Sequence, residues 1–149
     1  MRVDTKAYGS IDVDERQTIE FPYGILGFER LKDYVLLDAP QQPFYWLQAM
    51  DLVEVAFVLI NPVIFRPDYV VEVSPEELEE IGIDSQEQML TFAIVTVPPN
   101  PMEMTANLQG PIIINKETRI GRQCISVNPK WEVRHPILKE LAAVREQPC

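Results

Sequence analysis

Residues 33–62 read DYVLLDAPQQPFYWLQAMDLVEVAFVLINP, and this stretch decides the fold class. It contains three apolar runs rich in β-branched and aromatic residues, at 33–38, 44–50 and 53–60. Two prolines, which are disfavoured in strand interiors, separate the first two runs, and the third ends at Asn61-Pro62, a turn dipeptide. The gaps are too short for the helices that connect parallel strands, so the runs predict adjacent antiparallel strands.

Similar signals extend along the chain in both directions. We expect further strands at residues 3–8, 18–21, 69–73, 89–97, 112–115 and 119–127. The first should end in a turn at Gly9-Ser10, and the last two should form a hairpin around residues 116–118, preceded by a polar turn at 105–110. Many short strands at this spacing favour an antiparallel barrel or sandwich. The prediction is an all-β fold, a compact antiparallel β-barrel-like domain with one or two short helices.

The clearer of two helix signals begins at Ser74. Serine at the N-cap, Pro75 at the first helical position and Glu77 three residues after the cap form the pattern of a capping box, in which two side chains satisfy free backbone N–H groups. Gly82 should end this short helix. A second helix is expected at 136–144, where apolar residues recur at helical spacing.

Length and composition describe a single globular domain. The chain has 149 residues, of which 46% are hydrophobic and 24% charged, so we assign residues 1–149 to one domain with a frayed tail at 146–149. The longest apolar run, 55–60, is far shorter than the ~18 residues of a membrane span. The N-terminus shows no secretory signal, and two cysteines support no disulfide framework. We therefore expect a cytoplasmic protein that does not contact the membrane.

The charge is strongly negative and uneven. The formal net charge is −10, so direct binding to nucleic acid, which relies on basic side chains, is not expected. Residues 1–90 carry a net charge of −12 and residues 91–149 a net charge of +2. This asymmetry favours an acidic face. It is equally consistent with a surface that is merely soluble and with one that steers a basic partner.

No arrangement of residues points to catalysis or to a cofactor. The single histidine, His135, precedes Pro136 at the expected helix start, where a cap or surface role is more common than general-base chemistry. The serines lie outside any nucleophile motif, and the His, Cys and acidic residues lack metal-ligand spacing. Gly24 and Gly27 are not followed by the lysine and hydroxyl of a phosphate-binding loop. Cys124, in the middle of an expected strand, is interpreted as a buried structural thiol.

Four segments together are distinctive. Residues 21–29 read FPYGILGFE, residues 57–62 read FVLINP, residues 105–115 read TANLQGPIIIN, and residues 121–123 read GRQ. In this order and spacing they resemble the flagellar assembly factor FliW family over about residues 3–138. The helix after Ile137 departs from the pattern.

This resemblance implies a non-enzymatic regulator with a compact β-barrel-like fold. Members of the family bind flagellin in the cytosol, in a chaperone-like role. They also bind the carbon storage regulator CsrA, an RNA-binding dimer that represses flagellin translation, and so relieve the repression. The acidity of the chain agrees with this reading, because a negative field attracts a basic RNA-binding protein and repels phosphate.

Site residues follow from the motifs and from the proline-bounded loops. We expect a structural role for the motif residues Phe21, Gly24, Gly27, Phe28, Phe57, Pro62, Asn107, Pro111, Asn115 and Gln123. The apolar contacts with partners are expected at Tyr45, Trp46, Met102 and Met104, next to Glu103. The electrostatic contacts are expected at Glu72, Glu76, Glu77 and Glu80.

Two other functions remain open at the sequence level. A small-ligand-binding β-barrel would use the aromatic and β-branched strands to enclose a cavity. A carboxylate hydrolase would need two facing acids in a cleft.

Overall fold

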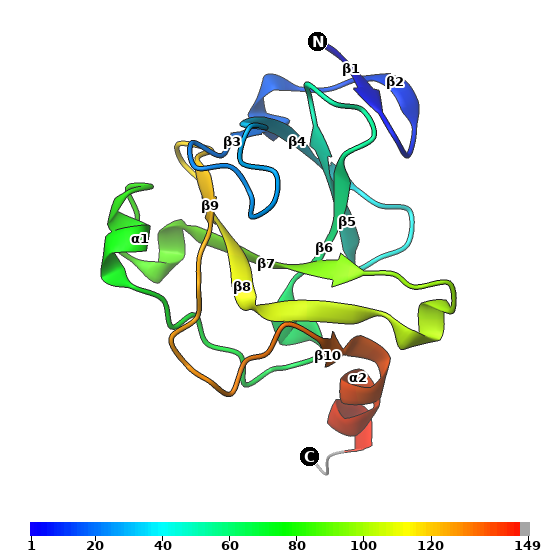
Figure 1. Ribbon diagram of the computed structural model, residues 1–149, viewed down its shortest axis with the longest axis vertical. Helices are drawn as coiled ribbons and strands as arrows, with labels where there is room; N and C mark the ends of the chain where they lie inside the picture. The colour runs from blue at the N-terminus through cyan, green and yellow to red at the C-terminus, as the bar shows by residue number, and fades with distance from the viewer. Residues whose placement is uncertain (147–149) are drawn as a thin grey trace.

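The computed structural model describes residues 1–146, so all but the first residue of the tail expected at 146–149 lies outside the described residues (Figure 1). Within this range the strands are β1 (Arg2–Thr5), β2 (Gly9–Asp12), β3 (Thr18–Glu20), β4 (Asp33–Asp38), β5 (Phe44–Ala49), β6 (Ala56–Ile60), β7 (Met89–Thr96), β8 (Thr105–Asn115), β9 (Gly121–Gln123) and β10 (His135–Pro136). The α-helices are α1 (Pro75–Glu79) and α2 (Ile137–Glu146). Short 3₁₀ turns connect several of these elements.

One antiparallel sheet dominates the molecule. Its path runs β10-β8-β7-β6-β5-β4-β3, and β9 pairs with the second half of β8. The two ends approach each other, because Glu20 at the end of β3 bridges Ile120 and its N–H donates to the carbonyl oxygen of Arg119 at 3.0 Å. The sheet is therefore nearly closed into a barrel, which confirms the predicted fold class. Hydrogen bonding between its ends removes part of the exposed strand edge.

The stretch that decided the fold class forms β4, β5 and β6, paired in sequence order. Leu36 lies opposite Leu47, and Leu47 lies opposite Phe57. β4 is apolar at consecutive positions because both of its faces are covered. Tyr34 points into the central core, whereas Val35 packs against the β1–β2 hairpin.

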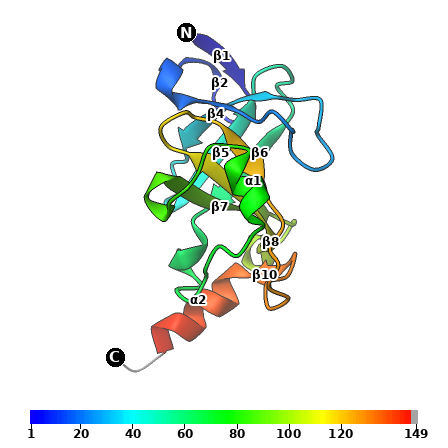
Figure 2. The same ribbon diagram turned by 90° about the vertical axis from the view of Figure 1, so that its left-hand side faces the viewer.

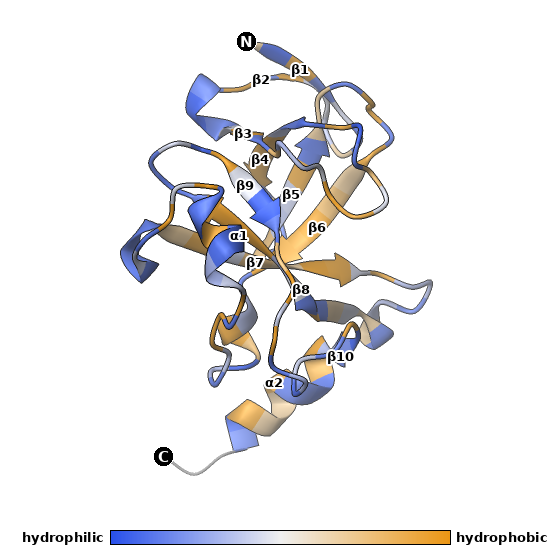
Figure 3. Cartoon of the chain, turned by 60° about the vertical axis from the view of Figure 1, so that its left-hand side comes forward, coloured by the Kyte–Doolittle hydropathy of each residue, from blue (hydrophilic) through white to orange (hydrophobic). Residues whose placement is uncertain are grey.

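Ten buried residues form the central core inside the sheet. Smaller cores surround it. The hairpin covers β4 at one end, α2 covers the outer side of β8 at the other, and α1 lies over β9. Figure 2 shows the hairpin and α2 at opposite ends of the molecule. Figure 3 shows the apolar colouring of β6 and β7 and the polar colouring of α1.

The N-terminal strand is shorter than predicted. β1 ends at Thr5, and Gly9-Ser10 begins β2 instead of forming the turn. The reason is the Thr5 hydroxyl, which donates to the carbonyl oxygen of Gly9 and accepts from the N–H of Tyr8, each at 2.8 Å. Gly9 has φ +69°, a conformation that glycine adopts without strain.

Two further strand predictions were wrong, one in where the strand begins and one in that no strand forms. β6 begins at Ala56, because residues 52–55 form a turn in which Val55 N–H donates to Leu52. Residues 69–73 form no strand. They are linked to the 126–127 segment by a Val73–Ser126 bridge and one further backbone hydrogen bond. β-branched composition alone does not provide a pairing partner.

The predicted turn at residues 105–110 lies inside one long strand, β8. Its pairing with β7 shifts register, because Phe92 faces Ile112 whereas Ile94 faces Asn107. The residues that were predicted to form a turn therefore form a bulge within the strand. The following hairpin is confirmed, but its second strand, β9, covers only three of the nine residues expected at 119–127.

Both predicted helices are present. Ser74 caps α1 by accepting from the N–H of Glu76 at 3.2 Å, and Gly82, with φ +73°, follows the helix. The reciprocal half of the capping box is wrong, because the Glu77 side chain turns away and accepts from the N–H of Ile125 at 3.3 Å. The second helix, α2, begins at Ile137, one residue later than predicted.

Candidate partner-binding surfaces

The loop of residues 21–29 is anchored at its two aromatic ends. Phe21 is fully buried edge-on against Tyr34, with ring centroids 5.3 Å apart, and Phe28 meets Phe57 in the same manner at 5.2 Å. Gly24 has φ +67°, and a Cβ at that position would lie 2.4 Å from the Cα of Glu29. Gly27, with φ +89°, also requires a left-handed backbone.

Gln123 and Asn107 tie this loop to the bulge in β8. The Asn107 Oδ1 accepts from the N–H groups of Gln109 and Gly110 at 3.0 and 2.9 Å. The Gln123 side chain donates to the carbonyl oxygen of Gly110 and accepts from the N–H of Leu26. These contacts support a structural role for both residues.

Three other motif residues also make contacts within the chain. Asn115 is buried, and its amide donates to the carbonyl oxygens of Ile81 and Gly82 after α1 while its Oδ1 caps the β8–β9 turn. Pro62 is buried at the start of a 3₁₀ turn that carries the chain away from β6. The carbonyl oxygen of Pro111 accepts from the N–H of Cys124.

Of the predicted apolar contact residues, Tyr45 and Trp46 do not share a surface. They are neighbours on β5, so their side chains point to opposite faces of the sheet. Tyr45 packs edge-on against Phe92 at 5.2 Å. Trp46 packs against the small core that lies between β4 and the β1–β2 hairpin.

An apolar groove of about 440 Å³, which we call the Trp46 groove, brings Trp46 and Met104 together. It is lined by Ala39, Gln41, Phe44, Trp46, Val58, Val97, Pro101 and Met104. Phe44 and Trp46 face it from alternate positions of β5, and Val58 lies opposite Trp46 on β6. An exposed, uncharged hollow of this kind is typical of a protein contact site.

The loop between β7 and β8 forms one wall of the groove. Asn100 caps a 3₁₀ turn by accepting from the N–H of Met102, and Pro101 occupies the first position of that turn. As a result Met102 points outward with 71% of its surface exposed, whereas Met104 packs inward. Glu103, beside them, is exposed.

The predicted acidic residues lie around α1, and some of them are paired with other side chains. Arg122 on β9 pairs with Glu80 and approaches Glu77, its Nε 3.6 Å from a Glu77 oxygen. Glu72 accepts from the Asn128 side chain. Glu76 is exposed on the first helical turn. Glu76 therefore fits the expected electrostatic role better than the paired Glu77.

A charged cluster that the sequence did not predict holds α2 against the barrel. Arg66 donates to Glu140 on α2 at 2.7 Å and to Asp68 at 2.8 Å. The hydrogen bonds that Asp68 accepts from Arg66 and Lys130 hold the pKa of its carboxyl well below the ordinary value. The Arg66 guanidinium also lies over the ring of Trp131, 4.7 Å from its centroid.

His135 belongs to the same cluster, and the expectation of a cap or surface residue was wrong. It is 8% exposed, and its Nε2 accepts from the N–H of Glu132 at 2.9 Å. The proton of the neutral ring therefore sits on Nδ1, which faces Glu140 at 3.1 Å. The histidine has the geometry of a structural link between β10 and α2.

No three His, Cys, Asp or Glu side chains among residues 1–146 are grouped as metal ligands. No helix within the same range is both long and apolar enough to cross a bilayer.

Comparison with known proteins gives the family. The family model described as FliW protein matches residues 2–137. The chain belongs to the FliW family. The flagellar assembly factor FliW of Treponema denticola is 43% identical over 143 residues, covering 96% of this chain and 97% of the relative. That of Leptospira interrogans is 45% identical over 144 residues, covering 95% and 96%.

A solved structure supports the same family assignment. The crystal structure of a flagellar assembly factor FliW superposes with a TM-score of 0.84 at 34% identity, covering 92% of this chain and 96% of the other. The FliW family match ends at Ile137, the first residue of α2.

Several surface residues of this FliW-family chain were not predicted from the sequence. The Trp46 groove is lined by Phe44, Val58 and Val97, and none of these was predicted as a contact residue. The period-two alternation of β5 could have indicated that Phe44 accompanies Trp46 and that Tyr45 does not. The pairing of Arg66 with Glu140 had no sequence signal, because these residues lie on separate elements.

Proposed function

We propose that this protein is a cytosolic flagellar assembly factor that binds flagellin and the translational regulator CsrA. By occupying CsrA it relieves the repression of flagellin translation. The observation that carries the proposal is similarity over nearly the full length to relatives named flagellar assembly factors.

Charge and surface shape support a function that depends on binding. The net charge of −10 favours fast association with a basic RNA-binding protein and repels RNA phosphates near the complex. Charges of this kind mainly set the association rate, whereas buried apolar anchors hold a complex together. The Trp46 groove offers such anchors, and Met102, which follows lining residue Pro101 in the chain, is exposed.

The protein is proposed to act without catalysis. Large side chains fill the inside of the sheet, including Phe21, Tyr34 and Leu59. This packing argues against the alternative of a small-ligand-binding barrel. Arg122 pairs with Glu80 and approaches Glu77, which does not favour these acids as a hydrolytic pair.

The direct test is complex formation with purified partners. The protein is mixed separately with flagellin and with CsrA, and complexes are detected by size-exclusion chromatography with light scattering. We expect both complexes to form. Failure to bind either partner would contradict the proposal.

A matched pair of variants tests the Trp46 groove. Val97 lines it and is 51% exposed, whereas Val133 lies outside it and is 50% exposed. Val97→Asp places a charge in the apolar groove and should weaken at least one complex about tenfold, equivalent to ~1.4 kcal/mol. Val133→Asp should leave both affinities unchanged. Equal binding by the two variants would exclude the groove as the contact site.

A further inference from the structure

The β7 strand has an edge that its neighbour leaves unpaired. β6 and β7 pair from Val58–Val95 to Ile60–Ala93, and the ladder stops there. In the same register Pro62 would face Thr91, but proline has no N–H to donate. Asn61 and Pro62 instead turn the chain into a 3₁₀ segment that leaves the sheet. The half of β7 from Met89 to Thr91 is therefore bonded to β8 on one side and open on the other.

The direction of the backbone groups follows from the β7–β8 ladder. Lys116 N–H donates to the carbonyl oxygen of Gln88 at 2.9 Å, so the groups of Gln88, Leu90 and Phe92 point toward β8. Those of Met89 and Thr91 point away from it. The Met89 N–H is taken by the carbonyl oxygen of Gln86. Both backbone groups of Thr91 and the carbonyl oxygen of Met89 remain directed toward the open side.

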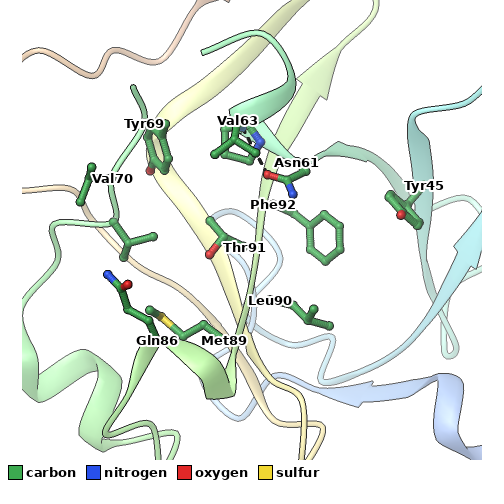
Figure 4. Close-up of a pocket in the computed structure, with 12 residues that line it drawn as sticks. Tyr45, Asn61, Val63, Tyr69, Val70, Gln86, Met89, Leu90, Thr91 and Phe92 are labelled. Atoms are coloured by element: carbon green, nitrogen blue, oxygen red, sulfur yellow. Dashed lines mark hydrogen bonds between the residues drawn. The ribbon is translucent and has the colours of Figure 1, made fainter. Parts of the chain in front are cut away.

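A groove of about 470 Å³, which we call the β7-edge groove, lies along this edge. Figure 4 shows its two walls, with Leu90, Phe92 and Tyr45 on one side of β7 and Tyr69, Val70 and Gln86 on the other. No charged side chain lines it within the described residues. A second hollow of about 330 Å³ shares Val71, Gln86 and Met89 with it and extends the groove past α1.

We propose that the β7-edge groove binds an extended segment of a partner protein, which adds to the sheet as a strand beside Met89–Thr91. The main-chain groups of Thr91 would provide the hydrogen bonds, and the two walls would receive side chains that alternate along the segment. This site is separate from the Trp46 groove, because Tyr45 and Trp46 point to opposite faces of β5.

Charge indicates the chemistry of the occupant. The groove is uncharged, so the paired residues of the segment should be β-branched or aromatic. Asp84 and Glu87 are exposed where the chain enters β7, next to lining residue Gln86. A lysine or arginine at that end of the segment would meet these carboxylates. The occupant is therefore a short β-forming segment whose paired residues are uncharged and which carries a basic residue at one end.

The test uses the full chain and a displayed library of random heptapeptides. We expect enrichment of peptides that alternate β-branched or aromatic residues and carry a basic end. A synthetic copy of an enriched peptide should bind Val70→Asp at least about tenfold more weakly than the unmodified protein. Val70 lines the groove and is 50% exposed. Val133→Asp, at a position that has the same 50% exposure but lies outside both grooves, should bind the peptide normally.

Amide hydrogen exchange tests the strand geometry itself. The Thr91 amide should exchange rapidly in the free protein and be protected when the peptide is bound, whereas Leu90 and Phe92 should be protected in both states. N-methylation of the peptide amides that face β7 should abolish binding. The proposal is overturned if no peptide is enriched, if Val70→Asp and Val133→Asp bind equally, or if Thr91 is already protected in the free protein. None of these measurements depends on flagellin or CsrA, so their outcome is independent of the proposed function.

Discussion

The contact between Gly121 and Phe21 explains at the residue scale why two distant motifs occur together. A Cβ on Gly121 would lie 2.7 Å from a ring carbon of Phe21, and that ring is fully buried in the central core. The glycine of the β9 motif is thus required by the aromatic residue that begins the 21–29 loop.

We expect Gly121→Ala to lower the free energy of unfolding by about 1–3 kcal/mol, because overpacking forces the buried ring to shift. Denaturant unfolding measures this loss. In a Phe21→Leu background, where the ring is absent, the same substitution should cost less. An equal cost in both backgrounds would mean that the ring contact is not the cause.

Cys124 gives a second prediction at the same scale. Burial raises the pKa of its thiol to about 12, so almost no thiolate forms at pH 8. In a Cys149→Ser variant, which leaves Cys124 as the single thiol, a thiol reagent at pH 8 should label the folded protein very slowly and the urea-unfolded protein rapidly. Rapid labelling of the folded protein would show that the thiol is accessible.

The attachment of α2 belongs to the scale of elements. Glu140 is the α2 side chain that meets both Arg66 and His135, and all three residues are largely buried. The helix contributes Ile137 and Leu141 to the small core between α2 and β8. Apolar packing and one charged cluster therefore hold the same helix.

Glu140→Gln should lower the free energy of unfolding by about 1–3 kcal/mol, because the largely buried Arg66 guanidinium loses one of its two charged acceptors. The same denaturant measurement applies. Glu146→Gln, at the exposed end of the same helix, is the control and should have almost no effect. If both variants are equally stable, the cluster does not anchor α2.

Net charge acts at the scale of the whole molecule. If the −10 charge steers the proposed association with CsrA, the association rate should fall by about an order of magnitude as ionic strength rises from low to physiological. The dissociation rate should change little, because apolar contacts control it. Stopped-flow measurements over a salt series separate the two rates. A salt-insensitive association rate would remove steering from the mechanism.

How far the sequence predicted the fold differs between elements. β4, β5 and β7 were predicted to within a residue, because their apolar runs and proline boundaries are local signals. Residues 69–73 have strand-like composition but find no ladder partner. The turn signal at 105–110 became a bulge because β7 pairs on both sides of it. Pairing between distant segments decided these cases.

The candidate sites also divide into features that the sequence determined and features that depend on the tertiary structure. The sequence by itself determined an antiparallel sheet, two short helices and an acidic chain, because alternation, capping and composition are properties of neighbouring residues. Only the tertiary structure decided that Trp46 and Met104 share a groove, that Tyr45 faces elsewhere, and that β7 keeps a free edge. Such surfaces form where segments distant in sequence end their pairing, and no local pattern records where that occurs.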